Sequence, residues 1–301
     1  MSWIVLSIFS AVMLGIYDVA KKLSVRENAV PIVLLANVMV GAAICAPLIF
    51  WSAIAPESVP IDLFRVDALS SLEHVMIFAK AALVGASWTF AFFALKHLPL
   101  SIAAPIRATS PFWTILIAIP FLGERPDGMQ WVGMAITLVG FWMFSIVGSR
   151  EGIRFTRNRW VGCMIIATLL GAMSGIYDKI LMQNMAMRPT NVQAWFAVYL
   201  VPVMMPLALR WYLRDRRRNP FHWRRVILTV SPLLLIADML YFTAIADPES
   251  MISIISTVRR CSVVIAFAVG IKVFGEANFW PKAYCILAIA LGVLLLTMQS
   301  G

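Results

Sequence analysis

The sequence predicts an all-α protein that crosses a membrane about ten times, as two inverted repeats of five transmembrane helices. Apolar residues, counted as Ala, Val, Ile, Leu, Met, Phe, Trp, Tyr and Cys, make up 61% of the 301 residues, and only 13% are charged. The mean hydropathy is +0.86. A soluble domain of this length has no core large enough to bury so many apolar side chains, whereas a bilayer supplies an apolar environment.

The apolar residues form ten stretches separated by short polar hinges. A spanning helix needs about 20 mostly apolar residues, and backbone polar groups in lipid must be satisfied within the segment, so each stretch is expected to be helical. The first stretch lacks a basic region before it and is interpreted as a span, not as a cleavable signal peptide. The predicted spans lie near 3–21, 30–54, 75–95, 100–122, 129–147, 160–182, 191–211, 227–246, 250–274 and 281–298.

Rare polar residues of the first half recur in the second half in the same order. The run GIYD at 15–18 recurs at 175–178, and the Gly-Glu pair at 123–124 recurs at 275–276. Arg107 matches Arg259 at the second of these offsets. Chance easily matches Leu with Leu, but it seldom matches Asp, Arg and Tyr in order. We therefore predict two repeats, residues 1–150 and 151–301. Five spans per repeat invert the second repeat, a plan that binds substrate near the midplane in many secondary transporters.

The formal net charge of +10 does not indicate nucleic-acid binding, because the basic residues lie in loops between spans. Lys and Arg are concentrated in the loops after spans one, five and seven, which fall on one side of the predicted topology. The loop 55–74, on the other side, is mainly acidic. Basic loops favour the cytoplasm, so both termini are predicted to lie outside.

Several charged residues fall inside the predicted spans. A charge near the bilayer centre costs at least about 2.5–3.5 kcal/mol on insertion scales, so such residues usually face a cavity or one another. The repeat predicts two equivalent pairs, Asp18 with Arg107 and Asp178 with Arg259. Asp238 has no acidic counterpart and is the candidate for an asymmetric role, such as a proton or cation site. The intramembrane charges are Asp18, Arg107, Asp178, Lys179, Asp238, Arg259 and Arg260.

Each of these charges also has a structural explanation. Asp18, followed by Lys21 and Lys22, could end the first helix at the membrane interface. Arg107 could form a structural ion pair as readily as it could contact substrate. The two arginines of the ninth span lie deeper, and there we favour a functional role. Lys80 lies near a span end and is interpreted as snorkelling to the interface.

Aromatic residues accompany the charges. Tyr17, Tyr177 and Tyr241 lie beside or near charged positions, and tyrosine combines a hydroxyl with an apolar face. Trp88, on the third span, is predicted to line a cavity, with core or interfacial packing as the alternative.

Small residues mark two further spans. Gly133 and Gly140 in the fifth span, and Ala288 and Gly292 in the tenth, permit close helix approach. We interpret these spans as scaffold or as faces of a homodimer, not as substrate-lining helices.

The sequence carries no signature of an enzyme. The four cysteines and three histidines are scattered, which argues against zinc or a disulfide framework. HExxH, P-loop and GxSxG motifs are absent. We therefore predict no catalysis, metal or cofactor. Without a nucleotide-binding domain, transport would use a gradient or run downhill.

The run PIRATSPFWTILIAIPFLGERP and the hinge at 123–125, with its copy at 275–276, resemble the drug/metabolite transporter superfamily, specifically its EamA-like ten-helix members. The resemblance covers nearly the whole chain. It implies a central cavity lined by spans one, three, four, six, eight and nine. Together with the charge argument, this implies a site made of Tyr17, Asp18, Trp88, Arg107, Tyr177, Asp178, Asp238, Tyr241, Arg259 and Arg260.

Two features depart from the family pattern. Typical members have few charges in spans four and nine, so the arginines there indicate an anionic substrate. Members usually have cytoplasmic termini, whereas the charge distribution predicts the opposite.

Three hypotheses of function follow. The first is an alternating-access exporter or exchanger of a small polar metabolite in a bacterial inner membrane. In it, Arg107 and Arg259 bind a negative group, the two GIYD aspartates act as counter-ions, and Asp238 couples to protons. The second is a lipid or lipid-linked sugar flippase, opening between helices toward lipid. The third is a non-transporting scaffold or sensor, whose charged cavity residues would all be paired.

Overall fold

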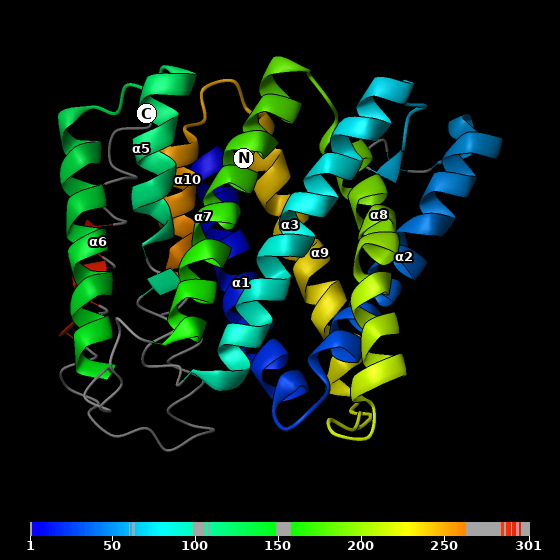
Figure 1. Cartoon of the computed structure of the whole chain (residues 1–301). Helices are drawn as coiled ribbons and strands as arrows, with labels where there is room; N and C mark the ends of the chain where they lie inside the picture. Colours follow the sequence, from blue (N-terminus) through cyan, green and yellow to red (C-terminus); the bar gives the residue numbers. More distant parts are fainter. Residues whose placement is uncertain are drawn as a thin grey trace.

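The computed structural model describes residues 2–59, 61, 64–98, 106–107, 109–148 and 158–262, together with 284–285, 287–289, 291–292 and 295. In these residues every regular element is a helix, and the long helices stand side by side in one bundle (Figure 1). The elements are α1 (Trp3–Val25), α2 (Val30–Ile54), η1 (Pro56–Ser58), α3 (Ser71–His97), α5 (Ser110–Leu122), α6 (Gly128–Gly148), α7 (Arg159–Lys179), η4 (Ile180–Asn184), α8 (Pro189–Arg210), η5 (Trp211–Asp215), α9 (Val226–Ala246) and α10 (Ile252–Arg260).

Seven of the predicted spans coincide with described helices. The predicted span 100–122 is described at 106–107, at 109 and over α5, and its other residues lie outside the described part of the chain. Six helices are long and apolar enough to cross a membrane, namely α1, α2, α3, α7 with η4, α8 with η5, and α9; α5 and α6 contain shorter apolar helices. The predicted span 250–274 is described over α10 and as far as residue 262, and the span 281–298 only at the residues given above. The rest of these two spans lies outside the described residues. The chain is thus a multi-pass membrane protein.

Local sequence explains where the helices begin and end. The Ser70 hydroxyl accepts the backbone N–H of Glu73 at 3.3 Å, and the Glu73 carboxylate accepts the backbone N–H of Ser70 at 2.7 Å. This capping box starts α3 at residue 71, earlier than hydropathy predicted. The Asn158 side chain caps α7 by accepting the backbone N–H of Trp160 at 3.0 Å. Gly123, with φ of 66°, ends α5 in the left-handed conformation that favours glycine.

Many large apolar side chains are exposed on the outside of the bundle, and polar groups are buried in its interior beside an apolar core. Ile54 and Phe121 are 83% and 80% exposed, whereas Ser10 and Thr137 are fully buried. Buried hydroxyls satisfy themselves on the backbone; Ser10 Oγ, for example, donates to the carbonyl of Ala237 at 2.7 Å. This distribution fits a lipid environment.

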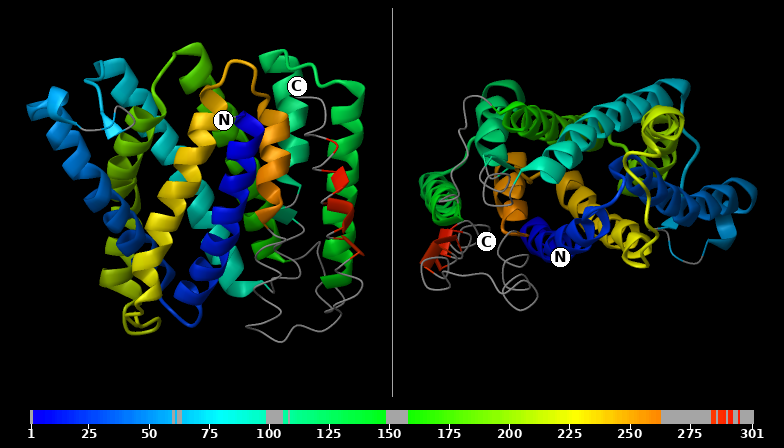
Figure 2. Two further views of the ribbon diagram at one scale, coloured as in Figure 1. Left: turned by 180° about the vertical axis from the view of Figure 1, so that it is seen from behind. Right: turned by 60° about the horizontal axis from the view of Figure 1, so that its bottom comes forward.

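Long helices from the two halves of the chain pack against each other. α1 packs mainly on α9, α3 on α7, and α2 on α8. Figure 2 places α2 at one edge of the bundle and α6, with residues 284–292, at the opposite edge.

The small residues of spans five and ten meet within this one chain. A Cβ on Gly140 would lie 2.8 Å from Cγ1 of Ile289 and 3.3 Å from the carbonyl oxygen of Cys285. A Cβ on Gly292 would lie 2.8 Å from the carbonyl oxygen of Gly133. The contact explains these glycines as scaffold, without requiring a second copy.

The basic loops after spans one and seven lie at one end of the bundle, together with the start of α7. Asn28, after α1, donates to the carbonyl of His222 at 2.8 Å, so the loops after spans one and seven touch. The rings of His97 and Trp160 stack at 4.0 Å, bringing the start of α7 to the same end. The loop before α3 lies at the other end, where Asp67 pairs with the loop before α8 at 3.0 Å.

Candidate functional site

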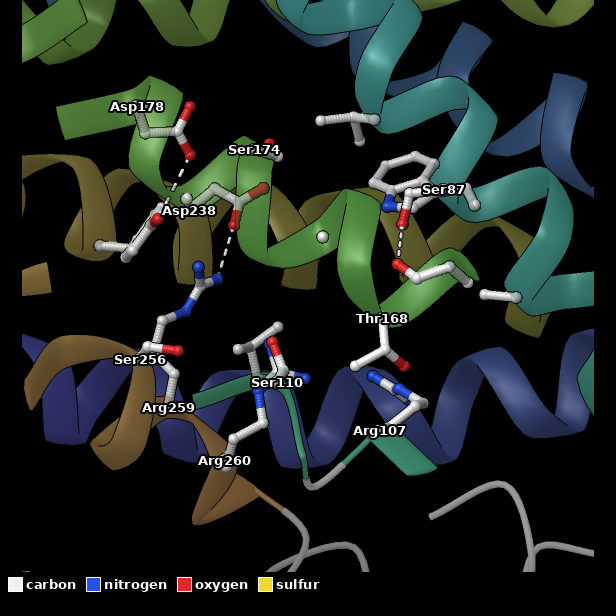
Figure 3. A pocket seen from close by; sticks show the side chains of 18 of the residues that line it. Ser87, Arg107, Ser110, Thr168, Ser174, Asp178, Asp238, Ser256, Arg259 and Arg260 are labelled. Atoms are coloured by element: carbon white, nitrogen blue, oxygen red, sulfur yellow. Dashed lines mark hydrogen bonds and ion pairs between the residues drawn. The ribbon is translucent and has the colours of Figure 1, made fainter. Parts of the chain in front are cut away.

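A cavity of about 200 Å³ lies between the two halves of the chain (Figure 3). Its lining comes from α1, α3, α5, α7, α9 and α10, together with Arg107 before α5 and Phe196 of α8. These are the spans that the family resemblance implied, with α8 added.

The cavity contains more positive than negative charge. Among the described lining residues there are five cations and three carboxylates, an excess of two positive charges. The cations are Lys21, Lys80, Arg107, Arg259 and Arg260, and the carboxylates are Asp18, Asp178 and Asp238.

The predicted pair between Asp18 and Arg107 is present. Arg107 Nη1 lies 3.5 Å from Asp18 Oδ1, and the side chains are 31% and 17% exposed. This is the longest and most exposed ion pair in the cavity, so it is the one most readily opened by a competing anion.

The second pair was not predicted. Lys80 Nζ contacts Asp178 Oδ1, and both side chains are almost fully buried. The Tyr241 hydroxyl donates to the other carboxylate oxygen at 3.2 Å. The ammonium group also lies 4.6 Å from the ring centroid of Phe196 and 4.8 Å from that of Phe242. The prediction that Lys80 snorkels is therefore wrong: because α3 starts at residue 71, Lys80 lies well inside the bundle.

The third pair joins Asp238 to Arg259 at 2.8 Å. The Arg259 guanidinium also lies 3.7 Å from the ring centroid of Tyr241, in a cation–π contact. The predicted pairing of Asp178 with Arg259 is therefore wrong. Asp178 is paired with Lys80 instead, and Arg259 with Asp238. Neither Lys80 nor Asp238 has a like-charged residue at the matching position of the other half of the sequence, so the second half pairs its charges differently from the first.

Two of the cations, Lys21 and Arg260, have no carboxylate within ion-pair distance in the described part of the chain. Lys21 is 5% exposed, and its ammonium group lies 4.2 Å from the ring centroid of Phe92 and 5.4 Å from that of Tyr17. The buried Nε of Arg260 has no hydrogen-bond partner there. Since α1 continues to Val25, Lys21 lies inside the bundle and does not end the helix at the interface.

Hydroxyl and aromatic groups complete the lining. Trp88 lines the cavity, as predicted, together with Tyr17 and Tyr241. The hydroxyls include Ser256, which donates to Thr114 Oγ1 at 3.2 Å. Such groups can hydrogen-bond a polar substrate beside the charges.

Tyr177 lies outside the cavity lining. Its hydroxyl donates to the carbonyl of Met76 on α3 at 3.2 Å. Successive residues of a helix point about 100° apart, so Asp178 can face the cavity while its neighbour faces α3.

Glu124 is a buried residue whose role sequence reasoning missed. Its carboxylate accepts the backbone N–H groups of Ile252 at 2.6 Å and Ser253 at 3.1 Å, capping α10. It also accepts a hydrogen bond from Lys179 Nζ at 2.7 Å, and the same ammonium group donates to the carbonyl of Ser250 at 3.0 Å. The only signal in the sequence was the recurring Gly-Glu hinge. These contacts join three segments at the end of the bundle opposite the basic loops.

The described residues contain no group of three or more His, Cys, Asp or Glu side chains arranged to hold a metal ion.

Comparisons with known proteins agree with this architecture. Residues 1–146 match the EamA-like transporter family. A crystal structure of a protein resembles the chain with a TM-score of 0.72 and 15% sequence identity, over 98% of each chain. This likeness concerns the fold alone. No curated protein matches the chain.

Proposed function

We propose that this chain, which belongs over its residues 1–146 to the EamA-like transporter family of the drug/metabolite transporter superfamily, is a secondary transporter of a small anionic metabolite. Members of that family are transporters and not enzymes. One observation carries the anionic assignment, namely the excess of two positive charges in the cavity.

The proposed architecture is two inverted five-helix repeats, residues 1–150 and 151–301, which enclose the cavity and alternate its access. Helix packing supports it. In the two repeats α1 corresponds to α7, α3 to α9 and α5 to α10. Contacts between the halves then have equivalents: α1 packs on α9 as α7 packs on α3, and α5 packs on α7 as α10 packs on α1. The directions of α1 and α7 support it as well. α1 ends, and α7 begins, at the end of the bundle with the basic loops.

In the proposed mechanism the substrate's negative group competes with carboxylates for arginines. Arg107 is held by a single long contact to Asp18, so an anion can displace that carboxylate at little cost. Arg259 is held more tightly by Asp238. Protonation of Asp238 would release Arg259 to the substrate, so a proton would travel with the anion. A charge exposed to low dielectric is costly, which favours movement of the neutralised assembly.

Two cavity cations, Lys21 and Arg260, meet no carboxylate in the described part of the chain. This argues against a non-transporting scaffold, for which all charged cavity residues were predicted to be paired. We place the protein in a bacterial inner membrane with its basic loops in the cytoplasm and its N-terminus outside. A reporter that is active only in the cytoplasm, fused after Gly301, should then stay inactive. A signal from the reporter would show that Gly301 lies in the cytoplasm and would contradict the proposed orientation.

The test of transport is flux into liposomes of labelled anionic metabolites, offered as a panel. Arg259→Ala should abolish substrate-dependent flux without loss of folded protein. Arg188→Ala is the matched control, since Arg188 also pairs with an aspartate but outside the cavity. Unchanged flux in Arg259→Ala would overturn the assignment, and scrambling of labelled lipid in place of metabolite flux would indicate a flippase.

A second variant tests the coupling. Asp238→Asn keeps the shape of the side chain and removes its titration, so transport should lose its dependence on a pH gradient. If that dependence persists, Asp238 is not the coupling site.

A further inference from the structure

The charges of the cavity form two clusters of different composition. The balanced cluster consists of Lys80, Asp178, Asp238 and Arg259, in which each cation meets a carboxylate. The basic cluster consists of Asp18, Lys21, Arg107 and Arg260, in which three cations share one carboxylate. In Figure 3, Asp178 lies across the cavity from Arg107 and Arg260.

From this imbalance we infer that the basic cluster binds a compact dianion of the phosphoryl type. The inference rests on the proposed transport of an anion and specifies the charge and shape of the group that is bound.

Lys21 is the first support for this inference. It is buried and lines the cavity, yet no carboxylate of the described residues comes within ion-pair distance of it. The rings of Phe92 and Tyr17 lie near its ammonium group and attract it, but they do not neutralise its charge. An unneutralised ammonium in a membrane interior is unfavourable, so its retention here points to a mobile counter-ion.

Arg260 is the second support. Its side chain lines the same cavity, and its Nε, buried, meets no acceptor in the described ranges. A guanidinium presents a planar fork of donors that matches the oxygens of a phosphate or carboxylate. Ser110 and Ser262, on α5 and just after α10, line the cavity as further donors.

The three cations act on one another, which places them in one cluster. Burial disfavours the positive charge of Lys21 most; the charges of Arg107 and Arg260 also repel it, and Asp18 attracts it. Arg107 likewise repels Arg260. A single anionic group bound among them would relieve all three repulsions at once.

The charge count sets the charge of the ligand. Asp18 neutralises one of the three cations, and two positive charges remain. Because the balanced cluster needs no further anion, both negative charges belong on one group at the basic cluster. A phosphoryl monoester fits, since it carries close to two charges above its second pKa of about 6. Free phosphate, whose second pKa lies about one unit higher, is also mainly a dianion at pH 8. A dicarboxylate spreads its charges, and a phosphodiester carries only one.

The experiment is thermal unfolding of the purified full-length protein at pH 8 and constant ionic strength, since a ligand of the folded form raises the midpoint. The probes are inorganic phosphate, glycerol 3-phosphate, succinate, acetate and glycerophosphocholine. Phosphate or glycerol 3-phosphate should bind at least about tenfold more tightly than the other three, the effect expected of one further charged hydrogen bond. Tighter binding of glycerol 3-phosphate than of phosphate would identify a phosphorylated metabolite, and the reverse would identify free phosphate.

Variants test the cluster itself. Lys21→Gln and Arg260→Gln should each weaken phosphate binding about tenfold and remove the preference over acetate. Lys21→Arg keeps the charge and should keep that preference, which guards against a folding defect in Lys21→Gln. Lys22→Gln is the matched control, because Lys22 is the next residue of α1 and does not line the cavity.

Several results would overturn the inference. Equal binding of acetate or succinate would exclude a compact dianion, and preference for glycerophosphocholine would point to a lipid headgroup. If Lys22→Gln weakens phosphate binding as much as Lys21→Gln does, the effect is not specific to Lys21 and the basic cluster is not the binding site. If a monoanion is bound and carried in an Arg259-dependent way, the dianion inference fails while the proposed transport stands. If liposome flux shows no anion carried at all, both fail.

Discussion

The balanced cluster and the basic cluster lie in one cavity but differ in what completes them. In the balanced cluster each cation is paired with a carboxylate, although the buried Nε of Arg259 has no hydrogen-bond partner among the described residues. Lys80 and Asp178 are almost completely sealed from solvent. In the basic cluster the one ion pair is long and partly exposed, and Lys21 and Arg260 meet no carboxylate among the described residues. The first cluster is therefore complete without a ligand, and the second is complete only with one.

The largest expected effect comes from breaking the balanced cluster. Asp178→Asn would leave the Lys80 ammonium buried without its carboxylate, and breaking one partner of a buried pair costs about 3–5 kcal/mol. The unfolding midpoint in detergent should fall steeply. Lys21→Gln should lower it little or not at all, because it removes a repelling charge.

A double variant separates charge from shape in the same test. Lys80→Met with Asp178→Leu replaces the pair by apolar side chains of similar size and should recover much of the lost stability. If Asp178→Asn lowers the unfolding midpoint as little as Lys21→Gln does, the two clusters do not differ in their contribution to stability.

A smaller effect is expected at Glu124, which lies outside both clusters. Glu124→Gln keeps an acceptor for the end of α10 but loses the charge that holds Lys179, so the free energy of unfolding should fall by about 1.5–3 kcal/mol. Thermal unfolding measures it.

Glu73→Gln is the matched control for Glu124→Gln. Glu73 also caps a helix but lies in an exposed capping box in which Gln is accepted. An equal loss in both variants would mean that Glu124 acts only as a cap and that its bond to Lys179 contributes nothing.

Hydropathy was enough to predict the helices but not the contacts between charges. The second span was predicted at both ends because polar or proline-containing hinges bound it. α3 begins earlier than predicted, since the capping box of Ser70 and Glu73 adds a first turn that hydropathy does not register. That extra turn hid the depth of Lys80, which looks like an interfacial lysine when its helix is started at residue 75.

Matching positions in the two halves of the sequence predicted one ion pair correctly and the other wrongly. Asp18 with Arg107 is present. Asp178 with Arg259 was predicted in the same way and is wrong, because Lys80 faces Pro232 in the alignment of the repeats and thus has no counterpart. Contacts such as that of Glu124 with Ile252 join residues 128 positions apart, and no local pattern carries that information.

The smallest expected effect distinguishes two tyrosines that sequence reasoning grouped together. Tyr177 hydrogen-bonds a carbonyl of α3 outside the cavity, whereas Tyr241 donates to Asp178 and stacks under Arg259. Tyr177→Phe should cost about 0.5–1.5 kcal/mol of stability and leave flux of the transported anion unchanged. Tyr241→Phe, measured in the same liposomes, should lower flux several-fold, since it loosens Asp178 beside the substrate. Equal losses of flux in the two variants would mean that Tyr177 reaches the substrate in another state of the transport cycle, and the site would then include both GIYD tyrosines.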